Sequence, residues 1–217
     1  MNVDHNLKVH KEIVKAWVLG WTLSRGTAPP VQIENAYRVD VGLPDHCTRY
    51  VLPQLDPNFL HDLTEQLLEP GTWLKICAPS ALVAPLLSQA WSIKDTGHMM
   101  IRALRVMARP APPDYLLVTT SDGAVLDVKM LDQAGEIAAT GRIAVIQPFA
   151  VIDQVVTSPS HQRRGLGSFV MEVLCQHAAE QGAQTGVLVA TDEGMALYRS
   201  LGWALHSVVT SAVIEMG

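Results

Sequence analysis

The stretch most informative about the fold lies in the second half of the chain and reads Val155-Val156-Thr157-Ser158-Pro159-Ser160-His161-Gln162-Arg163-Arg164-Gly165-Leu166-Gly167. It joins an apolar, β-branched run at residues 149–156 to a helical pattern at 167–181, which predicts a strand, a turn and a helix. Gly165 and Gly167 lack a Cβ, so the backbone can turn tightly there. The unpaired amides and partial positive charge of the helix start, with the two arginines, predict an anion site suited to a pyrophosphate.

Short glycine motifs are weak indicators by themselves, so other interpretations stand beside this one. The stretch lacks the Gly-Lys-Ser/Thr of a Walker A loop, and it is not the GxGxxG of a dinucleotide-binding turn. An ordinary strand–helix turn with two solvated arginines fits the same residues. The local residues alone leave the anion site and the ordinary turn open.

The rest of the second half predicts strands and helices that place this turn in a sheet. Before it come three strands that read as an antiparallel meander, at 115–119, 124–130 and 136–145. After it come a strand, a helix and a last strand, at 187–190, 193–201 and 207–214. A meander followed by a β-α-β unit predicts an α/β fold with a mixed, mostly antiparallel sheet flanked by helices.

A second motif follows the first by about thirty residues and reads Ala196-Leu197-Tyr198-Arg199-Ser200-Leu201-Gly202-Trp203. The first stretch resembles motif A of the GNAT acetyltransferase superfamily, where Gln/Arg-x-x-Gly-x-Gly/Ala follows a strand and a proline. The second resembles the Leu-Tyr-x-x-Leu-Gly-Phe/Trp signature of the same family. The two motifs have the order and spacing of the family, and the resemblance covers residues 114–217. It implies the GNAT fold for this half.

The resemblance implies acetyl-coenzyme A as the acyl donor and assigns two groups of residues to it. The strand before the turn would part from its parallel neighbour, with the thioester in the resulting V. The backbone of that strand would line the pantetheine arm, through Val155, Val156 and Thr157. The turn and helix start would hold the pyrophosphate, through Gln162, Arg163, Arg164, Gly165, Leu166, Gly167 and Ser168.

The resemblance also implies the reaction, which is attack of an amine on the thioester. Tyr198 matches the family's frequent general acid, and a tyrosine with a pKa near 10 is protonated at pH 7 and can donate to the leaving thiolate. The alternative is that the Tyr198 ring packs in the core and its hydroxyl bonds to a backbone carbonyl. No general base is proposed. Asp153 is interpreted as an ordinary residue of the strand, and His161 as an ordinary residue of the loop.

The chain departs from the family pattern at two positions. Val151 stands where some members have a catalytic glutamate, and Thr191 stands where many have an asparagine. Thr191 can still cap the following helix. These departures keep open an alternative function, a catalytically weak or inactive module that binds acyl-coenzyme A as a sensor or scaffold.

The first half, residues 1–109, is predicted to be a smaller α/β module, and residues 110–217 to be the acetyltransferase domain. The stretch Arg109-Pro110-Ala111-Pro112-Pro113 reads as an extended connector. A shift of 112 positions aligns residues 73–103 with 185–215 without a gap, with four identities. Chance explains these identities, and so does a degenerate second copy of the fold. Such a copy would be noncatalytic, because residues 50–55 contain no glycine and Leu86 stands at the place of Tyr198.

Composition limits the partners of the chain. The 217 residues carry a formal net charge of −5, so a basic nucleic-acid footprint is absent. The three cysteines form no CxxC pair, and no His/Cys spacing indicates a metal. No signal peptide or membrane span is recognised, which predicts a cytoplasmic protein; an oligomer is compatible with the sequence. Residues 110–217 carry −6, which mildly favours a cationic amine, on a small molecule or a peptide, as acceptor.

Overall fold

The computed structural model describes residues 11–106 and 110–216. The first half begins with a helix, which the helical spacing of the apolar residues in 9–24 predicts, and continues with strands and two short helices. Its elements are α1 (Lys11–Arg25), β1 (Val31–Ile33), β2 (Ala36–Leu43), β3 (His46–Leu52), α2 (Pro57–Gln66), β4 (Thr72–Ile76), α3 (Ser80–Val83), η1 (Ala84–Leu86) and β5 (Ser92–Ala103). Strands β1, β2, β3 and β5 were not assigned from the sequence. Pro110 to Pro113 lie outside helices and strands, whereas Arg109 lies outside the described residues.

The second half has the predicted order of elements, with bounds that differ by a few residues. Its elements are β6 (Leu116–Asp122), β7 (Val125–Leu131), β8 (Ile137–Ile146), β9 (Phe149–Thr157), η2 (Pro159–His161), α4 (Leu166–Glu180), β10 (Thr185–Ala190), α5 (Asp192–Ser200) and β11 (Ala204–Val213). The strand–turn–helix expected around Gly165 is thus formed by β9, the residues that follow it and α4.

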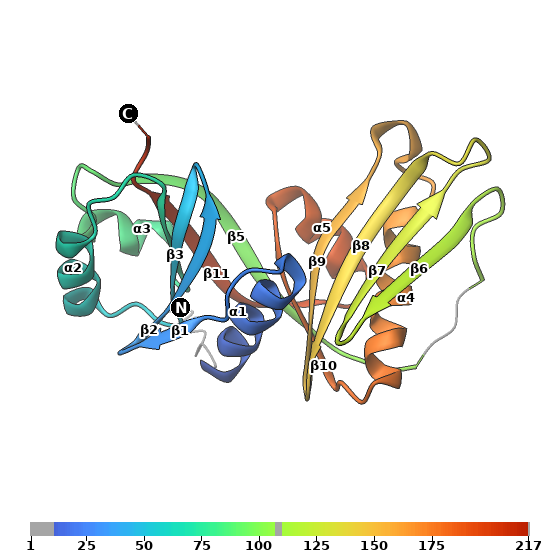
Figure 1. Cartoon of the computed structure of the whole chain (residues 1–217), viewed down its shortest axis with the longest axis horizontal. Helices are drawn as coiled ribbons and strands as arrows, with labels where there is room; N and C mark the ends of the chain where they lie inside the picture. Colours follow the sequence, from blue (N-terminus) through green and yellow to red (C-terminus); the bar gives the residue numbers. More distant parts are fainter. Residues whose placement is uncertain (1–10, 107–109, 217) are drawn as a thin grey trace, which may run out of the picture.

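All strands belong to one 11-stranded sheet with the order β1-β2-β3-β4-β11-β5-β10-β9-β8-β7-β6. Only the β3–β4 and β9–β10 pairs are parallel. The sheet is therefore mixed and mostly antiparallel, with helices on its faces, and this confirms the fold class inferred from the sequence (Figure 1).

The two halves exchange their last strands. β5, from the first half, lies beside β10, and β11, from the second half, lies beside β4 (Figure 1). The central order β3-β4-β11-β5-β10-β9 maps onto itself when the halves are interchanged. Each half thus has a β-α-β-α-β order ending in the exchanged strand. The predicted boundary near residue 109 separates the halves in sequence, but β5 pairs with strands beyond it.

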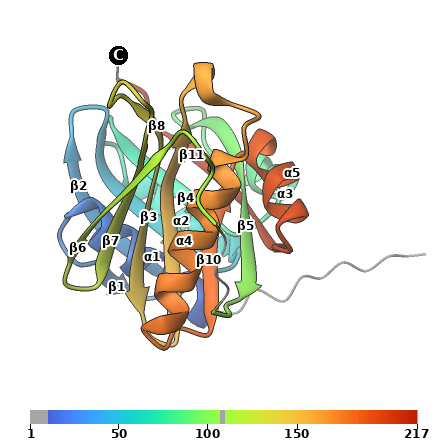
Figure 2. The ribbon, with the colours of Figure 1, turned by 90° about the vertical axis from the view of Figure 1, so that its right-hand side faces the viewer.

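Three hydrophobic clusters hold this sheet together. α4 packs on one face of the second-half strands, with Val170 and Leu174 fully buried (Figure 2). α1 lies against β8 and β9 and joins a central cluster that contains side chains from both halves, including Met99 of β5 and Val151 of β9. α2 and α3 cover the first-half strands. The shared central cluster makes each half depend on the other for part of its core.

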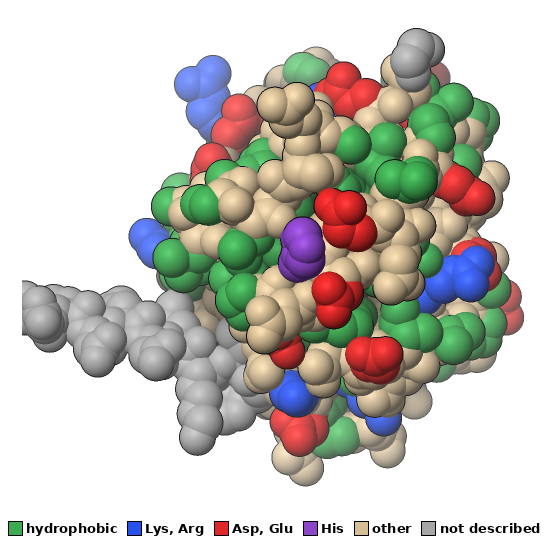
Figure 3. Space-filling model, turned by 90° about the vertical axis from the view of Figure 1, so that its left-hand side faces the viewer, with side chains coloured by type: hydrophobic (Ala, Val, Ile, Leu, Met, Phe, Trp, Pro, Cys, Tyr) green, Lys and Arg blue, Asp and Glu red, His purple; other side chains and the backbone are tan. Residues whose placement is uncertain are grey.

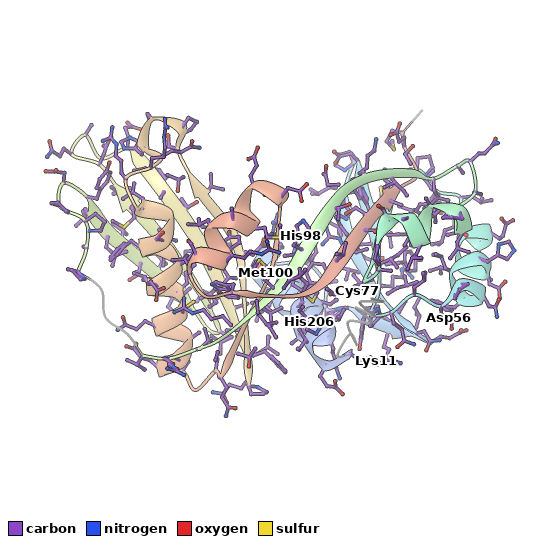
Figure 4. All side chains as sticks on the ribbon, turned by 180° about the vertical axis from the view of Figure 1, so that it is seen from behind. Lys11, Asp56, Cys77, His98, Met100 and His206 are labelled. Carbon is purple, nitrogen blue, oxygen red and sulfur yellow. The ribbon has the colours of Figure 1, made fainter. Side chains whose placement is uncertain are left out.

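The structure corrects one detail of the comparison between the halves. The shift of 112 positions places residues 50–52 opposite Gln162-Arg163-Arg164, but they are the end of strand β3. The turn that corresponds to the glycine-containing loop is therefore shorter and consists of Pro53-Gln54-Leu55-Asp56, which leads into α2. In Figure 4, Asp56 lies at the far end of the first half, whereas His98 and Met100 of β5 lie near the centre of the molecule.

Candidate active site

The site begins where two parallel strands separate. β9 and β10 pair only through their first residues, the last pair being Val151 with Val187. Beyond it β10 continues to pair with β5, while β9 pairs only with β8. Gln154 has a positive φ of 55°, and the β8–β9 register shifts beside it, which marks a β-bulge. The edge of β9 from Ile152 to Thr157 is thus unpaired on the side that faces β10.

A cavity of about 910 Å³ occupies this separation. It runs from the turn after β9, along the unpaired edge of that strand, to Tyr198 of α5 and to strands of the first half. Volumes of this size suit a cofactor or a drug-sized ligand. Backbone N–H and C=O groups of an unpaired strand edge need partners, which an extended ligand arm supplies.

The turn at one end of the cavity leaves the first amides of α4 open. Gly165 precedes the helix with φ of +78°, and a Cβ added there would have no atom within 4 Å. The first backbone bond of α4 runs from the Phe169 amide to the Gly165 carbonyl, at 3.0 Å. The amides of Leu166, Gly167 and Ser168 precede it and have no intrahelical acceptor. The helix start has no side-chain cap, so it is free to bind an anion.

The structure brings together most of the residues that the sequence singled out. The cavity is lined by Val155, Thr157, Gln162, Arg163, Gly165, Leu166, Gly167, Ser168 and Tyr198. Two predicted residues are not part of its lining. The Val156 side chain is 60% exposed. Arg164 donates from Nη1 to the Tyr115 hydroxyl, at 3.2 Å, so it is engaged with the β6 side of the molecule.

Tyr198 reaches the cavity from α5, which two contacts position. The Thr191 hydroxyl accepts a hydrogen bond from the Gly194 amide at 3.2 Å and caps the helix, as the sequence predicted. Asp192, in the first turn, lies 2.5 Å from Nε2 of His98 on β5. The Tyr198 ring packs edge-on against Trp203, with centroids 6.3 Å apart. The helix that carries Tyr198 is therefore held against a strand of the first half.

The Tyr198 hydroxyl is protonated at neutral pH. Burial, and secondly the negative charge of Asp153, raise the pKa of Tyr198 above its ordinary value of 10.0. Within the described ranges, no side chain or backbone group hydrogen-bonds to this hydroxyl. The alternative in which a backbone carbonyl accepts from it is absent from the described residues. The hydroxyl is available to donate a proton into the cavity.

Asp153, the carboxylate nearest to the cavity on β9, is engaged in structural contacts. Arg25 of α1 donates to it from Nε at 2.5 Å and from Nη2 at 3.0 Å, and Ser24 donates at 3.1 Å. His161 is equally engaged, by Tyr115 at 3.0 Å and Asp132 at 3.5 Å, and it does not line the cavity. Asp153 therefore lines the cavity while it is ion-paired with Arg25, and His161 lies outside the cavity.

The end of the cavity opposite the turn is cationic, which the sequence analysis missed. Arg49 of β3 and Lys75 of β4 line it, together with Trp17 and Trp21 of α1. Trp17 and Trp21 also belong to the central cluster, so they both pack in the core and line the cavity. The available signal was the pair of charges within apolar runs, Arg49 before Tyr50-Val51-Leu52 and Lys75 between Leu74 and Ile76.

Within residues 11–106 and 110–216, no group of three or more His, Cys, Asp or Glu side chains is placed to hold a metal ion. All three cysteines are free thiols. Among the helices in these ranges, none combines the length and the apolar character needed to cross a bilayer. The face of the first half in Figure 3 mixes acidic, basic and hydrophobic side chains.

Comparisons with known proteins agree with this geometry. The model of the acetyltransferase (GNAT) family matches residues 96–203, from the middle of β5 to Trp203. No curated protein sequence matches the chain. Among solved structures, a GCN5-related N-acetyltransferase from Kribbella flavida has a TM-score of 0.65 at 15% identity, covering 94% of this chain and 95% of that one.

Two further structures share the fold at low identity. A GCN5-related N-acetyltransferase from Sphaerobacter thermophilus has a TM-score of 0.60 at 14% identity, covering 84% of this chain and 78% of that one. A tandem GNAT protein from the clavulanic acid biosynthesis pathway has a TM-score of 0.55 at 14% identity, with the same coverages. With residues 96–203 matching the family model and the whole chain sharing the fold, this protein is an acyltransferase that belongs to the acetyltransferase (GNAT) family.

Proposed function

We propose that this chain transfers an acetyl group from acetyl-coenzyme A to a primary amine, of a small molecule or a peptide, by direct attack. The observation that carries the proposal is the continuous cavity that joins the open start of α4 to the Tyr198 hydroxyl along the unpaired edge of β9. The family generally uses acetyl-coenzyme A as donor. An arm extended between an anion site and a proton donor has the shape that this cofactor offers.

In this proposal the backbone performs most of the donor binding. The amides from Arg163 to Ser168 hold the pyrophosphate, with Gln162 and the Arg163 side chain beside it. The unpaired edge of Val155, Val156 and Thr157 bonds to the amides of the pantetheine arm. Val156 serves through its backbone alone, because its side chain is exposed on the other side of the strand. Arg164 contributes its amide, since its side chain is held by Tyr115.

The chemistry requires one proton donor from the chain. The lone pair of a neutral amine attacks the thioester carbonyl, forming a C–N bond and a tetrahedral intermediate. When the C–S bond breaks, Tyr198 gives its proton to the leaving thiolate, and the amine loses a proton to water. Water then restores the Tyr198 proton. Such general acid catalysis contributes about 10²–10⁴ in rate.

We also propose that the first half is a noncatalytic copy of the fold that shapes the acceptor side of the cavity. Its support is the strand order, which is unchanged when the halves are interchanged, and the similarity to a tandem GNAT protein. Its turn, Pro53–Asp56, contains no glycine, and Pro53 has no amide hydrogen to donate. The boundary between the two copies would lie near residue 109.

The test is the release of free thiol from acetyl-coenzyme A with a panel of primary amines. Wild type is expected to release thiol above the hydrolytic background with at least one amine. Tyr198→Phe should lower kcat by about 10²–10⁴ while acetyl-coenzyme A affinity stays within about twofold. Tyr37→Phe, which removes a hydroxyl on β2 outside the cavity, is the matched control. Thiol release by no amine, with acetyl-coenzyme A still bound, would instead identify a binding module without turnover.

A further inference from the structure

The cationic end of the cavity contains two buried charges without ion-pair partners. Arg49 is 8% exposed, and Lys75 is partly buried on the neighbouring parallel strand. Among the described residues, no carboxylate lies within ion-pair distance of either group. Their negative neighbours act at longer range, Asp153 on Arg49 and Asp95 on Lys75. Buried charges without a partner are costly and uncommon in folded proteins.

The contacts of the two side chains orient them but leave most of their donors open. Arg49 donates from Nε to His46 Nε2 at 3.2 Å and stacks on Trp21, with Cζ 3.9 Å from the ring centroid. Its two terminal nitrogens donate to no described residue. Lys75 uses one N–H to reach the Ser211 hydroxyl at 2.6 Å. A guanidinium and an ammonium with free donors at one end of a cavity form an anion-binding arrangement.

In the second half, the strand positions that correspond to Arg49 and Lys75 carry hydrophobic residues. Lys75 pairs with Val51 across the parallel strands, and the corresponding pair in the second half is Val187 with Val151. Two residues before Val51 stands Arg49, and two before Val151 stands Phe149. The apolar pair of the second half is fully buried. The cations of the first half therefore occupy positions at which the same fold elsewhere uses hydrophobic side chains.

The surroundings lower the pKa of both cations but leave them charged at neutral pH. Burial, and then Arg25, lower the pKa of Arg49 to about 10; burial, and then Arg49, lower the pKa of Lys75 to about 8. Burial, and then Arg49 and Lys75, lower the pKa of His46 to about 4, so His46 is neutral and adds no charge. Two carboxylates, Asp95 and Asp153, line the same part of the cavity. Asp153 is ion-paired with Arg25, so Asp95 alone offsets the charges of Arg49 and Lys75. The remaining positive charge is one that a ligand anion would neutralise.

We infer that the acceptor is an amine with an anionic group, a carboxylate or a phosphate, and that this group binds between Arg49 and Lys75. The inference rests on the proposed function and deepens it. The cavity connects this anion subsite to Tyr198, and Asp153 acts electrostatically on both Arg49 and Tyr198. The amine of a bound acceptor would face the thioester while its anion lies on the first-half strands. This differs from the cationic acceptor that the net charge of residues 110–217 favoured.

The first experiment measures anion binding without turnover. The protein is saturated with coenzyme A, which fills the start of α4, and is titrated with acetate and with inorganic phosphate by calorimetry and tryptophan fluorescence. We expect one anion per chain with millimolar affinity. Arg49→Met and Lys75→Met should each weaken binding at least about tenfold, because a hydrogen bond to a charged group is lost. Arg38→Met, an exposed change on β2, is the control. Absent binding by the saturated wild type overturns the subsite.

The second experiment measures preference with paired amines. β-Alanine is compared with β-alanine amide, and 2-aminoethylphosphonate with ethanolamine, by thiol release. Wild type should prefer the anionic member at least about tenfold in kcat/KM, and Arg49→Met should bring the ratio near one. Equal turnover of both members by wild type, without anion binding, overturns the subsite and leaves the proposed function intact. Anion binding without turnover of any amine overturns the proposed function and leaves the anion subsite intact. The phosphonate and carboxylate arms identify which anion fits.

Discussion

Helix α2 of the first half and helix α4 of the second half differ in what caps their N-terminus. In the first half, Asp56 caps α2 through a hydrogen bond that its carboxylate accepts from the Phe59 amide, at 3.1 Å. In the second half, Gly165 precedes α4 in a left-handed conformation and provides no side-chain cap. The first helix start has a carboxylate cap from the chain, whereas the second has no side-chain cap. Under the proposed function, this one helix terminus accounts for the difference in coenzyme binding between two halves that share a strand order.

The largest expected effect comes from closing the open helix start. Gly165→Val should weaken acetyl-coenzyme A binding by about 100-fold or more, because a branched side chain would stand where the pyrophosphate approaches. The substitution also forces a β-branched residue to a φ of +78°, which costs about 1–2 kcal/mol of stability. Calorimetric titration of acetyl-coenzyme A measures the effect.

Gly135→Val separates the two consequences of that change. Gly135 has a φ of +82°, and a Cβ there would also have no atom within 4 Å, but it lies in the turn between β7 and β8. It should lose similar stability and keep acetyl-coenzyme A affinity. Equal affinity of wild type and Gly165→Val would contradict the placement of the pyrophosphate.

The second expected effect concerns the cations that distinguish β3 and β4 from β9 and β10. Because burial lowers the pKa of Lys75 from 10.5 to about 8, its charged form destabilises the folded state at pH 7. Replacing it with methionine removes this cost and a hydrogen bond to Ser211. We expect a net gain of about 1–2 kcal/mol in the free energy of unfolding, and a rise in Tm of about 2–8 °C.

The stability gained by Lys75→Met should depend on pH in a defined direction. Between about pH 8 and 10.5 the unfolded chain holds the Lys75 proton while the folded chain releases it, so the Lys75 contribution to stability rises with pH. The advantage of Lys75→Met should therefore shrink across that window. Arg49 and Asp95 face Lys75 and are unchanged in the variant. Denaturant unfolding at pH 7 and 10 provides the comparison, and an advantage that is absent at pH 7 would contradict it.

The sequence predicted the second half better than the first, for a physical reason. Gly165, Gly167 and Tyr198 belong to local motifs in which the backbone and one side chain carry the chemistry, so neighbours in sequence define them. Arg49 and Lys75 become neighbours only through the parallel pairing of β3 with β4. They line the same cavity as Tyr198 because the exchanged last strands join the two halves in one sheet. The hydrophobic periodicity of a single segment does not indicate that the two halves exchange their last strands.

The short strands were missed for a related reason. Strands β1 and β2 are interrupted by polar residues, and only part of β2 is buried. The alternation of buried and exposed residues in these strands is therefore weak. They are held in the sheet by pairing, β1 with β2 and β2 with β3. By contrast, the pair Asp56-Pro57 in the sequence is enough to predict a helix that begins at Pro57, and α2 begins there. A cap and a proline at the first helical position act locally.

The smallest effect is expected when the capping carboxylate of Asp56 is removed from the first half. Asp56→Ala deletes the cap of α2 and should cost about 1 kcal/mol of stability, measured by denaturant unfolding. Thr191→Ala, which deletes the cap of α5, is the matched change in the second half and should cost a similar amount.

Neither change should alter the number of coenzyme sites, and this follows from the main chain of each turn. Even without Asp56, Pro53 of the first-half turn and Pro57 at the start of α2 donate no amide hydrogen, and the turn has no glycine to admit a phosphate. Calorimetry of Asp56→Ala should therefore still give one acetyl-coenzyme A per chain. A second site in that variant would mean that the carboxylate alone blocks it, and that the first half has kept a binding-competent backbone.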